Sequence, residues 1–199
     1  MKIVIGIDEV GRGPLAGPVC VCAFELRITD DELKIEKGQL KLKDSKKLSQ
    51  KQREAWMTII ETWQKEGKCD FAVSYTEAEE IDRIGLSQAI KNTLSSSLLK
   101  LADPEVDPLI LLDGGLYAPE IFKNQKTIIK GDEKEPAISF ASIVAKVHRD
   151  QLMAEYAKQY PEYGFESHVG YGTKAHYAAI KKHGLTPLHR RSFLKNLVK

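Results

Sequence analysis

The sequence predicts an α/β domain built on a mixed β-sheet flanked by helices. Two apolar runs, KIVIGID near the N-terminus and LILLDGG near the middle of the chain, lack the alternation of a half-exposed strand and indicate strands covered on both faces. Segments with helical periodicity lie between and after them. Strands mixed with helices in this order are typical of an α/β fold.

Each element in the first half has its own local signal. PVCVCAFEL, after a short connection that contains Pro14 and Pro18, predicts a second strand, and CDFAVSYT predicts a third. Between them, Ser49 and Gln52 predict a capping box at the start of a helix that ends at Gly67. The apolar stripe of that helix is expected to consist of Trp56, Ile59, Ile60 and Trp63.

The second half continues the mixture of helices and strands. Thr76 with Glu79 predicts the cap of a short helix, and a longer helix is expected over 86–101. Two Asp-Pro steps then favour a connector that leads into LILLDGG, and KTIIKG predicts a further strand. Helical patterns follow over 138–160 and near 175–183, before a basic tail.

The composition is that of a globular protein. The chain has 199 residues, enough for one sizeable domain, with 42% apolar and 29% charged residues. No apolar run approaches the roughly 18 residues needed to span a membrane, and the N-terminus lacks the pattern of a secretory leader. Three cysteines without a CxxC motif indicate neither a disulfide framework nor a zinc site. We therefore expect a cytoplasmic protein that does not engage a membrane.

Positive charge gathers in two places. A lysine cluster lies in KLKDSKKLS, and the stretch after Glu166 contains basic but no acidic residues. The first group is Lys41, Lys43, Lys46 and Lys47; the second is Lys174, Lys181, Lys182, Arg190, Arg191, Lys195 and Lys199. Such a group is either a solvated face or a contact to a polyanion, and the charges alone leave both open.

Acidic residues follow both buried strands. Asp8 and Glu9 end the first apolar run, and Asp113 ends the second. Functional groups of open α/β sheets collect beyond the carboxyl ends of strands, so these acids are candidates for one site. The alternatives are a solvated turn at Asp8 and Glu9, which should point to opposite faces of a regular strand, and a turn-forming role for Asp113.

A fourth acid is expected on the helix ISFASIVAKVHRDQ. At about 100° per residue, Ser139, Ser142, Lys146 and Asp150 share one stripe at the edge of the apolar face. We expect this stripe to bring Asp150 to the other acids, although Asp150 could instead pair with Lys146 one turn back. Several carboxylates within a few ångströms need a cation, and oxygen ligands suit Mg²⁺ or Mn²⁺. Two such ions about 4 Å apart can hold both the attacking and the leaving oxygen of a phosphodiester.

The glycine-rich segment GRGPLAG is not a nucleotide-binding loop. It lacks the G-x-G-x-x-G spacing, contains prolines that remove amide donors, and leads into a strand where a phosphate-binding helix would be required. Gly11 and Gly13 instead permit a ligand to approach the backbone closely, and Arg12 is available for a phosphate.

The chain resembles the type 2 ribonucleases H, and within them bacterial ribonuclease HII. The resemblance covers residues 5–193 in family order, through the segments GIDEVGRGPLAGPV, LKDSKKLS, EEIDRIGL, LLDGG, KGDEKEPAISFASIVAKVHRD, YPEYGFESHVGYGTKAH and GLTPLHRRSF. It implies a ribonuclease H-like mixed sheet flanked by helices over 1–166, with a basic C-terminal helical extension over 167–199 packed on it as one structural domain. Ribonuclease HIII is less similar, because it lacks the Gly-Arg-Gly turn and carries an extra N-terminal domain.

The resemblance also implies roles for individual residues. The metal-binding catalytic carboxylates would be Asp8, Glu9, Asp113 and Asp150. The turn Gly11, Arg12 and Gly13 would sense the 2′-hydroxyl of a ribonucleotide, and Tyr171 would pack on the sugar of the next deoxynucleotide. Lys46, Lys47, Ser142 and Lys146 would contact phosphate or support the site. His148, His168, His176 and His189 are given no catalytic role.

The activity implied is that of an endonuclease for RNA–DNA hybrids and for single ribonucleotides embedded in duplex DNA. It would act as a monomer with two Mg²⁺ or Mn²⁺ ions and cut 5′ to the ribonucleotide, leaving 5′-phosphate and 3′-hydroxyl ends. Two alternatives stay open at this point: a two-metal nuclease such as a junction resolvase, indifferent to the sugar, and a hybrid-binding module without catalysis.

Overall fold

A five-stranded mixed sheet forms the middle layer of the protein, in a computed structural model that describes residues 3–28 and 48–195. The strand order is β3-β2-β1-β4-β5; β1 runs antiparallel to β2, while β4 is parallel to both β1 and β5. The strands are β1 (Val4–Val10), β2 (Val19–Leu26), β3 (Cys69–Thr76), β4 (Leu109–Asp113) and β5 (Gln125–Ile128). This confirms the predicted fold class.

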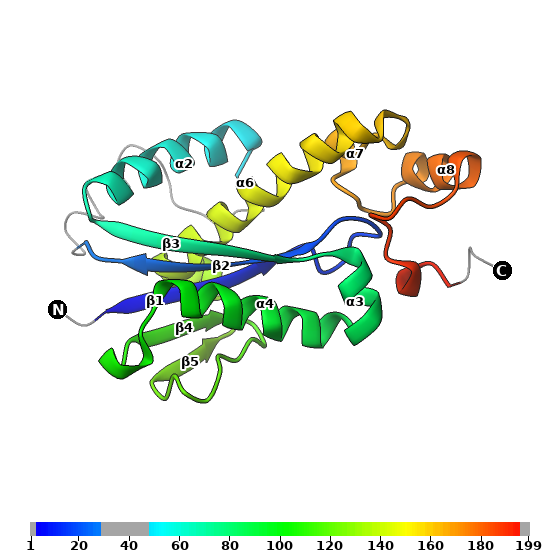
Figure 1. Ribbon diagram of the computed structural model, residues 1–199. Helices are drawn as coiled ribbons and strands as arrows, with labels where there is room; N and C mark the ends of the chain where they lie inside the picture. The colour runs from blue at the N-terminus through cyan, green and yellow to red at the C-terminus, as the bar shows by residue number, and fades with distance from the viewer. Residues whose placement is uncertain (1–2, 29–47, 196–199) are drawn as a thin grey trace.

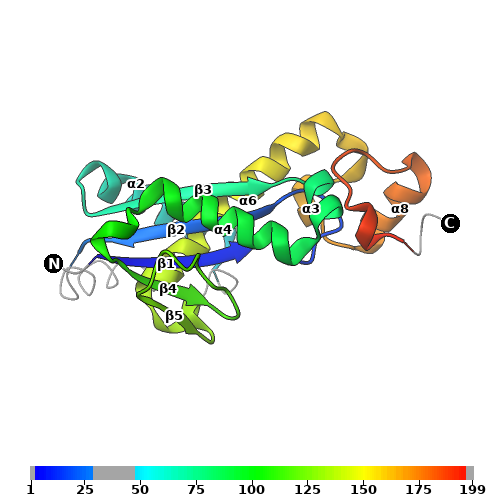
Figure 2. The ribbon, with the colours of Figure 1, turned by 60° about the horizontal axis from the view of Figure 1, so that its bottom comes forward.

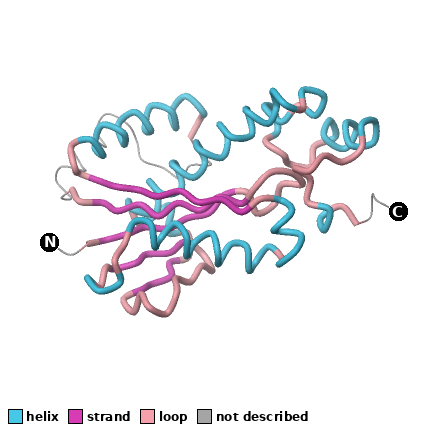
Figure 3. Tube along the Cα trace, in the orientation of Figure 1, coloured by secondary structure: helices cyan, strands magenta, loops and turns pink. Residues whose placement is uncertain are grey.

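Helices cover both faces of the sheet (Figure 1). The helices α2 and α6 lie on one face, and α3 and α4 lie on the other. The α-helices are α2 (Gln50–Lys65), α3 (Ala78–Ile84), α4 (Leu86–Leu101), α5 (Gly131–Lys134), α6 (Pro136–Gln159), α7 (Phe165–His168) and α8 (Lys174–His183). Short 3-10 turns are η2 (Pro104–Val106), η3 (Pro161–Tyr163) and η4 (Arg191–Phe193). Figure 3 shows that loops and short helices make up the end of the molecule that carries the C-terminus.

The two predicted helix caps have different outcomes. At α2 the capping box is confirmed, because the Gln52 N–H donates to the Ser49 hydroxyl and the Ser49 N–H donates to the Gln52 side chain. At α3 the predicted cap is wrong: the helix begins after Glu77 without a side-chain cap, and the hydroxyl of Thr76 bonds that of Thr93 at 2.6 Å. Thr76 is still the last residue of β3, so its side chain faces α4 and not the start of α3.

The first strand and the longest helix are in unusually close contact. A Cβ added to Gly6 would lie 2.1 Å from the carbonyl carbon of Ala137 at the start of α6, so only glycine permits this approach. From there α6 runs along the sheet. It contributes Phe140, Ile143 and Val144 to a core that also contains Cys20, Cys22 and Phe24 of β2. The close contact places the next residues of α6 beside the end of β1.

A third core lies beyond the end of the sheet. It joins the loop after β1, the second half of α6 and the C-terminal segment, and it contains Leu15, Ala16, Met153, Ala157, Tyr163, Phe165, Ile180 and Leu194. A short bridge pairs Ala16 with His189, and Figure 2 shows the C-terminal segment beside the turn that follows β1. The loop that follows β1 is therefore packed against the C-terminal segment.

The predicted lysine cluster 41–47, including Lys46 and Lys47, lies outside the described residues. Cys20, Cys22 and Cys69 are buried and free. Within the described part of the chain, no helix combines the length and the apolar character that crossing a bilayer requires.

Candidate active site

Two carboxylates meet where the parallel pairing of β1 with β4 ends. The last paired residues of these parallel strands are Ile7 and Leu112, so Asp8 and Asp113 are the next residues on adjacent strands. Both belong to the face covered by α6, because Ile7 and Leu112 pack on the opposite face with α4. Asp8 is 5% exposed and is hydrogen-bonded to Ser142 of α6. The strand register thus brings together two of the predicted site residues.

Glu9 lies beside them, and its two carboxylate oxygens differ in their hydrogen bonding. One oxygen, Oε1, accepts a 2.9 Å bond from Arg12, which is the first role that the structure gives this arginine. The other oxygen, Oε2, is buried and has no hydrogen-bond partner among the described residues. We call Asp8, Glu9 and Asp113 the carboxylate cluster.

Burial and neighbouring negative charge disfavour the ionised forms of Asp8 and Glu9. The pKa of Asp8 is raised well above its ordinary value, mainly by burial and then by the charges of Glu9 and Asp113, against the bond from Ser142. Burial also raises the pKa of Glu9, while Arg12 opposes the change. Oxygen ligands that carry unfavourable negative charge fit a hard divalent cation, and the orphan oxygen of Glu9 could act as one of its ligands.

The cluster is not closed around an ion. Within residues 3–28 and 48–195, no three acid, histidine or cysteine side chains already form a metal-binding group. Asp113 Oδ1 instead accepts a 2.6 Å bond from the N–H of Gly131. The carboxylates would therefore have to close around a cation when it binds.

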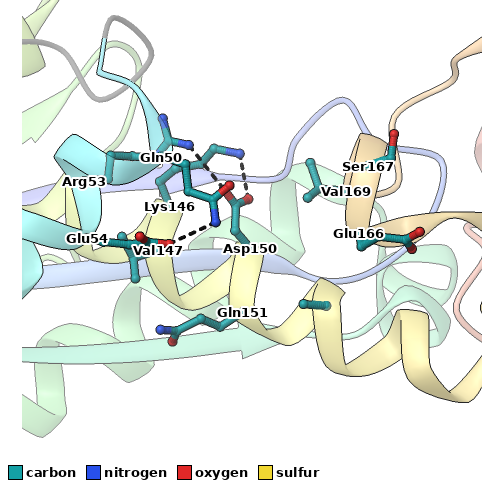
Figure 4. A pocket seen from close by; sticks show the side chains of 11 residues that line it. Gln50, Arg53, Glu54, Lys146, Val147, Asp150, Gln151, Glu166, Ser167 and Val169 are labelled. Carbon is teal, nitrogen blue, oxygen red and sulfur yellow. Dashed lines mark hydrogen bonds and ion pairs between the residues drawn. The ribbon is translucent and has the colours of Figure 1, made fainter.

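Asp150 is not brought to the cluster. It follows Ser142, the α6 residue that contacts Asp8, by eight positions, which is about 12 Å along a helix. Its carboxylate is held by Lys146 at 2.6 Å and by Arg53 at 3.6 Å, in a separate pocket between α2, α6 and α7 (Figure 4). The alternative pairing with Lys146 is therefore what the structure contains. A shared stripe on α6 does not bring Asp150 to the carboxylate cluster, because eight positions separate Asp150 from Ser142, the residue that contacts Asp8.

Asp132 is a buried acid that sequence reasoning missed. The chain leaves β5, turns at Lys130 with φ of 55°, and presents the Gly131 N–H to Asp113. The next residue, Asp132, is 5% exposed, and its backbone carbonyl accepts a bond from Ser139 of α6. The signal was present in KTIIKGD, since the acid follows a strand that is parallel to β4 and so ends at the same edge of the sheet.

The glycine-rich turn Gly11–Gly13 is fixed by a buried arginine. Arg190 is fully buried and donates to the carbonyls of Gly11 at 2.7 Å, Arg12 at 3.1 Å and Gly17 at 2.8 Å. In a trans peptide the N–H points opposite to the C=O, so the N–H groups of Arg12 and Gly13 point away from Arg190. Neither has a partner among the described residues, and both are available to a ligand.

A second buried arginine holds the rest of the loop. Arg149 donates to the carbonyls of Ala16, Pro18 and Val169 at 2.9–3.1 Å. Gly11 has φ of 91°, and a Cβ at this position would lie 2.5 Å from the Arg149 side chain. Sequence reasoning overlooked Arg149 and counted Arg190 among cations that could meet a polyanion. Burial corrects the second point, whereas Lys174, Lys181, Lys182, Arg191 and Lys195 are exposed.

Tyr171 lies against the turn. The residue is 43% exposed, and a Cβ on Gly13 would be 3.6 Å from Tyr171 Cε1. The structure therefore places an exposed aromatic ring beside two outward-pointing amides. Of the other predicted residues, Ser142 contacts Asp8, Lys146 pairs with Asp150, and Lys46 and Lys47 are outside the described residues.

Comparison with known proteins gives one consistent family. A family model described as ribonuclease HII matches residues 5–196. The chain is 48% identical to a ribonuclease HII of Endomicrobium trichonymphae, over 96% of this chain and 84% of that protein. It is 45% identical to a ribonuclease HII of Clostridium acetobutylicum, over 98% of this chain and 74% of that protein.

Solved structures agree with the sequence relatives. A PCNA:RNase HII complex from Archaeoglobus fulgidus contains a similar chain, with a TM-score of 0.75, 26% identity, and coverage of 94% of this chain and 93% of that one. Ribonuclease H2 from Pyrococcus horikoshii gives a TM-score of 0.72 with 25% identity, covering 99% and 97% of the two chains. A Bst-RNase HIII determined in complex with Mn²⁺ shares the fold, with a TM-score of 0.65, 18% identity, and coverage of 100% and 70%.

Replacement of Arg190 by lysine should destabilise the protein, because one ammonium cannot reach the three carbonyls that the guanidinium bonds. We expect the free energy of unfolding to fall by about 1–3 kcal/mol for each carbonyl left without a donor. Urea unfolding measures the change. The neighbouring Arg191→Lys is the matched control: its side chain is exposed, and it should change stability by less than about 0.5 kcal/mol. Equal effects of the two changes would contradict the role of Arg190.

Replacement of Asp8 by asparagine should stabilise the metal-free protein at neutral pH. The folded-state pKa of Asp8 is raised, so ionisation costs stability as pH rises above the unfolded-state pKa, and a neutral isostere removes that cost. We expect a higher melting temperature, by about 2–4 °C for each kcal/mol gained.

Mn²⁺ should reverse this order, since a bound cation stabilises the wild type by mass action and the variant less. Melting curves with and without Mn²⁺ check both points. A metal-free variant that melts below the wild type at pH 7 would contradict the analysis.

Proposed function

The chain belongs to the ribonuclease HII family and is a ribonuclease H endonuclease, and from this premise we propose that it cuts RNA–DNA hybrids and single ribonucleotides embedded in duplex DNA. The cut would fall 5′ to the ribonucleotide and leave 5′-phosphate and 3′-hydroxyl ends. We further propose that it works as a monomer in the cytoplasm, where its three free, buried cysteines suit a reducing compartment.

The observation that carries the substrate proposal is the pairing of the glycine-rich turn with Tyr171. RNA differs from DNA by the 2′-hydroxyl, which can both donate and accept a hydrogen bond. The outward N–H groups of Arg12 and Gly13 can donate to that hydroxyl, and glycine at position 13 leaves room for the sugar. The exposed ring of Tyr171 then offers a flat surface to the neighbouring deoxyribose.

The hydrolytic centre would be the carboxylate cluster with one further acid. Asp8 and Glu9 lie near the carboxyl end of β1, and Asp113 is the last residue of β4. Asp132 follows β5, the next parallel strand. The fourth ligand expected from the sequence, Asp150, is neutralised by Lys146 and Arg53 about two turns further along α6. We therefore favour Asp132 over Asp150 as the fourth carboxylate.

Two divalent ions, Mg²⁺ or Mn²⁺, would supply a water that is nucleophilic at neutral pH and would stabilise the charge that develops on the phosphate. The residues of the chain have separate tasks. The carboxylates hold the cations, Ser142 orients Asp8 through its hydrogen bond, and Arg12 bridges the sugar-sensing turn to Glu9. This bridge would fix the distance between the group that reads the sugar and the groups that bind metal.

The proposal is tested with a duplex DNA that contains one ribonucleotide and carries a 5′ label on the same strand. We expect one cut, immediately 5′ to the ribonucleotide, in the presence of Mg²⁺ or Mn²⁺. The all-DNA duplex of the same sequence is the control and should stay intact. Comparable cleavage of both duplexes would contradict sugar recognition and favour a two-metal nuclease that is indifferent to the sugar. Salt-sensitive binding without any cut would indicate a hybrid-binding module without catalysis.

Two single substitutions decide which acid completes the centre. Asp132→Asn should lower kcat by at least about 100-fold, because a metal ligand is lost, while Asp150→Asn should keep kcat within about tenfold of the wild type. Steady-state cleavage of the single-ribonucleotide duplex gives both values, and circular dichroism confirms that both variants fold. The reverse order would restore Asp150 as the fourth ligand.

A further inference from the structure

Three histidines are buried together under the segment that carries Tyr171. His168 from α7, His176 from α8 and His189 from the loop after α8 are 8%, 0% and 2% exposed. The rings of His168 and His176 are stacked with centroids 4.5 Å apart, and Nε2 of His176 lies 3.1 Å from Nε2 of His189. A hydrogen bond between two ring nitrogens requires one donor and one acceptor, so the protons of the two rings are linked.

The surrounding backbone determines where each proton is. The N–H of Thr186 donates to Nδ1 of His189 at 3.0 Å, so neutral His189 carries its proton on Nε2. That proton is donated to Nε2 of His176, which must then carry its own proton on Nδ1. Nδ1 of His176 lies 2.9 Å from the carbonyl oxygen of Tyr171 and donates to it. One set of tautomers thus satisfies every bond from Thr186 to Tyr171.

Both rings are held in the neutral form. Burial lowers the pKa of His189 to about 4, and the charges of His176 and Arg191 act in the same direction. Burial, with a smaller effect of His168, also lowers the pKa of His176. The packed neighbours Tyr163 and Phe165 contribute aromatic rings and no acid. At neutral pH the tautomers are therefore fixed.

Tyr171 needs such support because of its neighbours. It stands between Gly170, with φ of 88°, and Gly172, and glycines leave the backbone much freedom. Its N–H donates to the carbonyl of His168, and its carbonyl accepts from both the Thr173 N–H and His176. The bond from His176 joins this short segment to a side chain of α8 and, through His189, to the loop that ends at Arg190.

We propose that His176, oriented by His189, is a positioning residue that sets the place of Tyr171 against Gly13 and so the fit of the nucleotide next to the ribonucleotide. This deepens the proposed function and rests on it, because Tyr171 must touch the substrate. His176 itself makes no contact with substrate and moves no proton in the reaction. Its loss should weaken binding of the substrate and leave the hydrolytic step intact.

Two isosteric variants separate positioning from structural support. In His176→Asn the side-chain amide replaces Nδ1 and can still donate to the Tyr171 carbonyl, but His189 loses its acceptor. In His176→Gln the amide oxygen replaces Nε2 and can accept from His189, but the Tyr171 carbonyl loses its donor. Each variant loses one buried hydrogen bond, so their melting temperatures should fall by similar amounts.

The kinetic constants of the two variants should differ. With the single-ribonucleotide duplex, we expect His176→Gln to raise KM by about tenfold with kcat within about twofold, and His176→Asn to keep both constants close to wild type. In a Tyr171→Ala background, His176→Gln should have no further effect on KM, because the residue acts through Tyr171. Equal KM values for the Gln and Asn variants, or a change confined to kcat, would overturn the proposal.

Two further results distinguish this inference from the proposed function. If Tyr171→Ala alone leaves KM unchanged, the role of Tyr171 in the proposed function fails and the inference fails with it. If Tyr171→Ala raises KM and His176→Gln does not, only the inference fails. Nitrogen NMR of the wild-type histidines is independent of whether any variant folds: His176 must be the Nδ1–H tautomer and His189 the Nε2–H tautomer at pH 7. A protonated or inverted pair would refute the arrangement.

Discussion

The site depends on two arginines that are buried without a carboxylate at hydrogen-bond distance in the described part of the chain. Arg149 and Arg190 donate hydrogen bonds to backbone carbonyls of the loop between β1 and β2. Burial and the charge of Arg149 lower the pKa of Arg190 to about 10, which still leaves it charged at neutral pH. Each guanidinium satisfies several carbonyls in a fixed planar geometry, as lysine could not. The loop therefore has one conformation, with its free amides turned outward.

The carboxylate cluster is the opposite kind of structure. Its members are held by strand register and by α6, where burial, together with neighbouring carboxylates, disfavours the charged forms of Asp8 and Glu9. Arg12 connects the glycine-rich turn to the carboxylate cluster. Its guanidinium donates to Glu9, and its backbone carbonyl accepts from Arg190. If the proposed roles hold, the protein combines a preorganised surface for reading a sugar with a group of acids that a bound cation would stabilise. Active sites commonly contain groups that lower the stability of the folded protein but are needed for its activity.

The sequence predicted what local rules determine. The strands, the capping box at Ser49 and the turn that Gly11 permits follow from periodicity and backbone chemistry, and register then brought Asp8 to Asp113. Asp150 pairs with Lys146 and Arg53 and not with the other acids, because a helical stripe specifies direction and not position along the axis. Asp132 follows a segment that the sequence marks as a strand, but only the register of β5 to β4 places it at the same edge of the sheet as Asp113. Arg190 was taken for a surface cation because no pattern in a basic tail tells which guanidinium will find buried carbonyls.

The bond from Arg190 to Gly11 also links the shape of the turn to a remote part of the chain. It joins residues 179 positions apart, so the carbonyls of the loop after β1 obtain their donor from the C-terminal segment. Such pairing is slow to form, because long-range closure costs chain entropy before its contacts are made. Local opening of the C-terminal segment would withdraw the donor while the strands stay paired. How long the turn keeps its shape is therefore limited by how rarely a distant segment detaches.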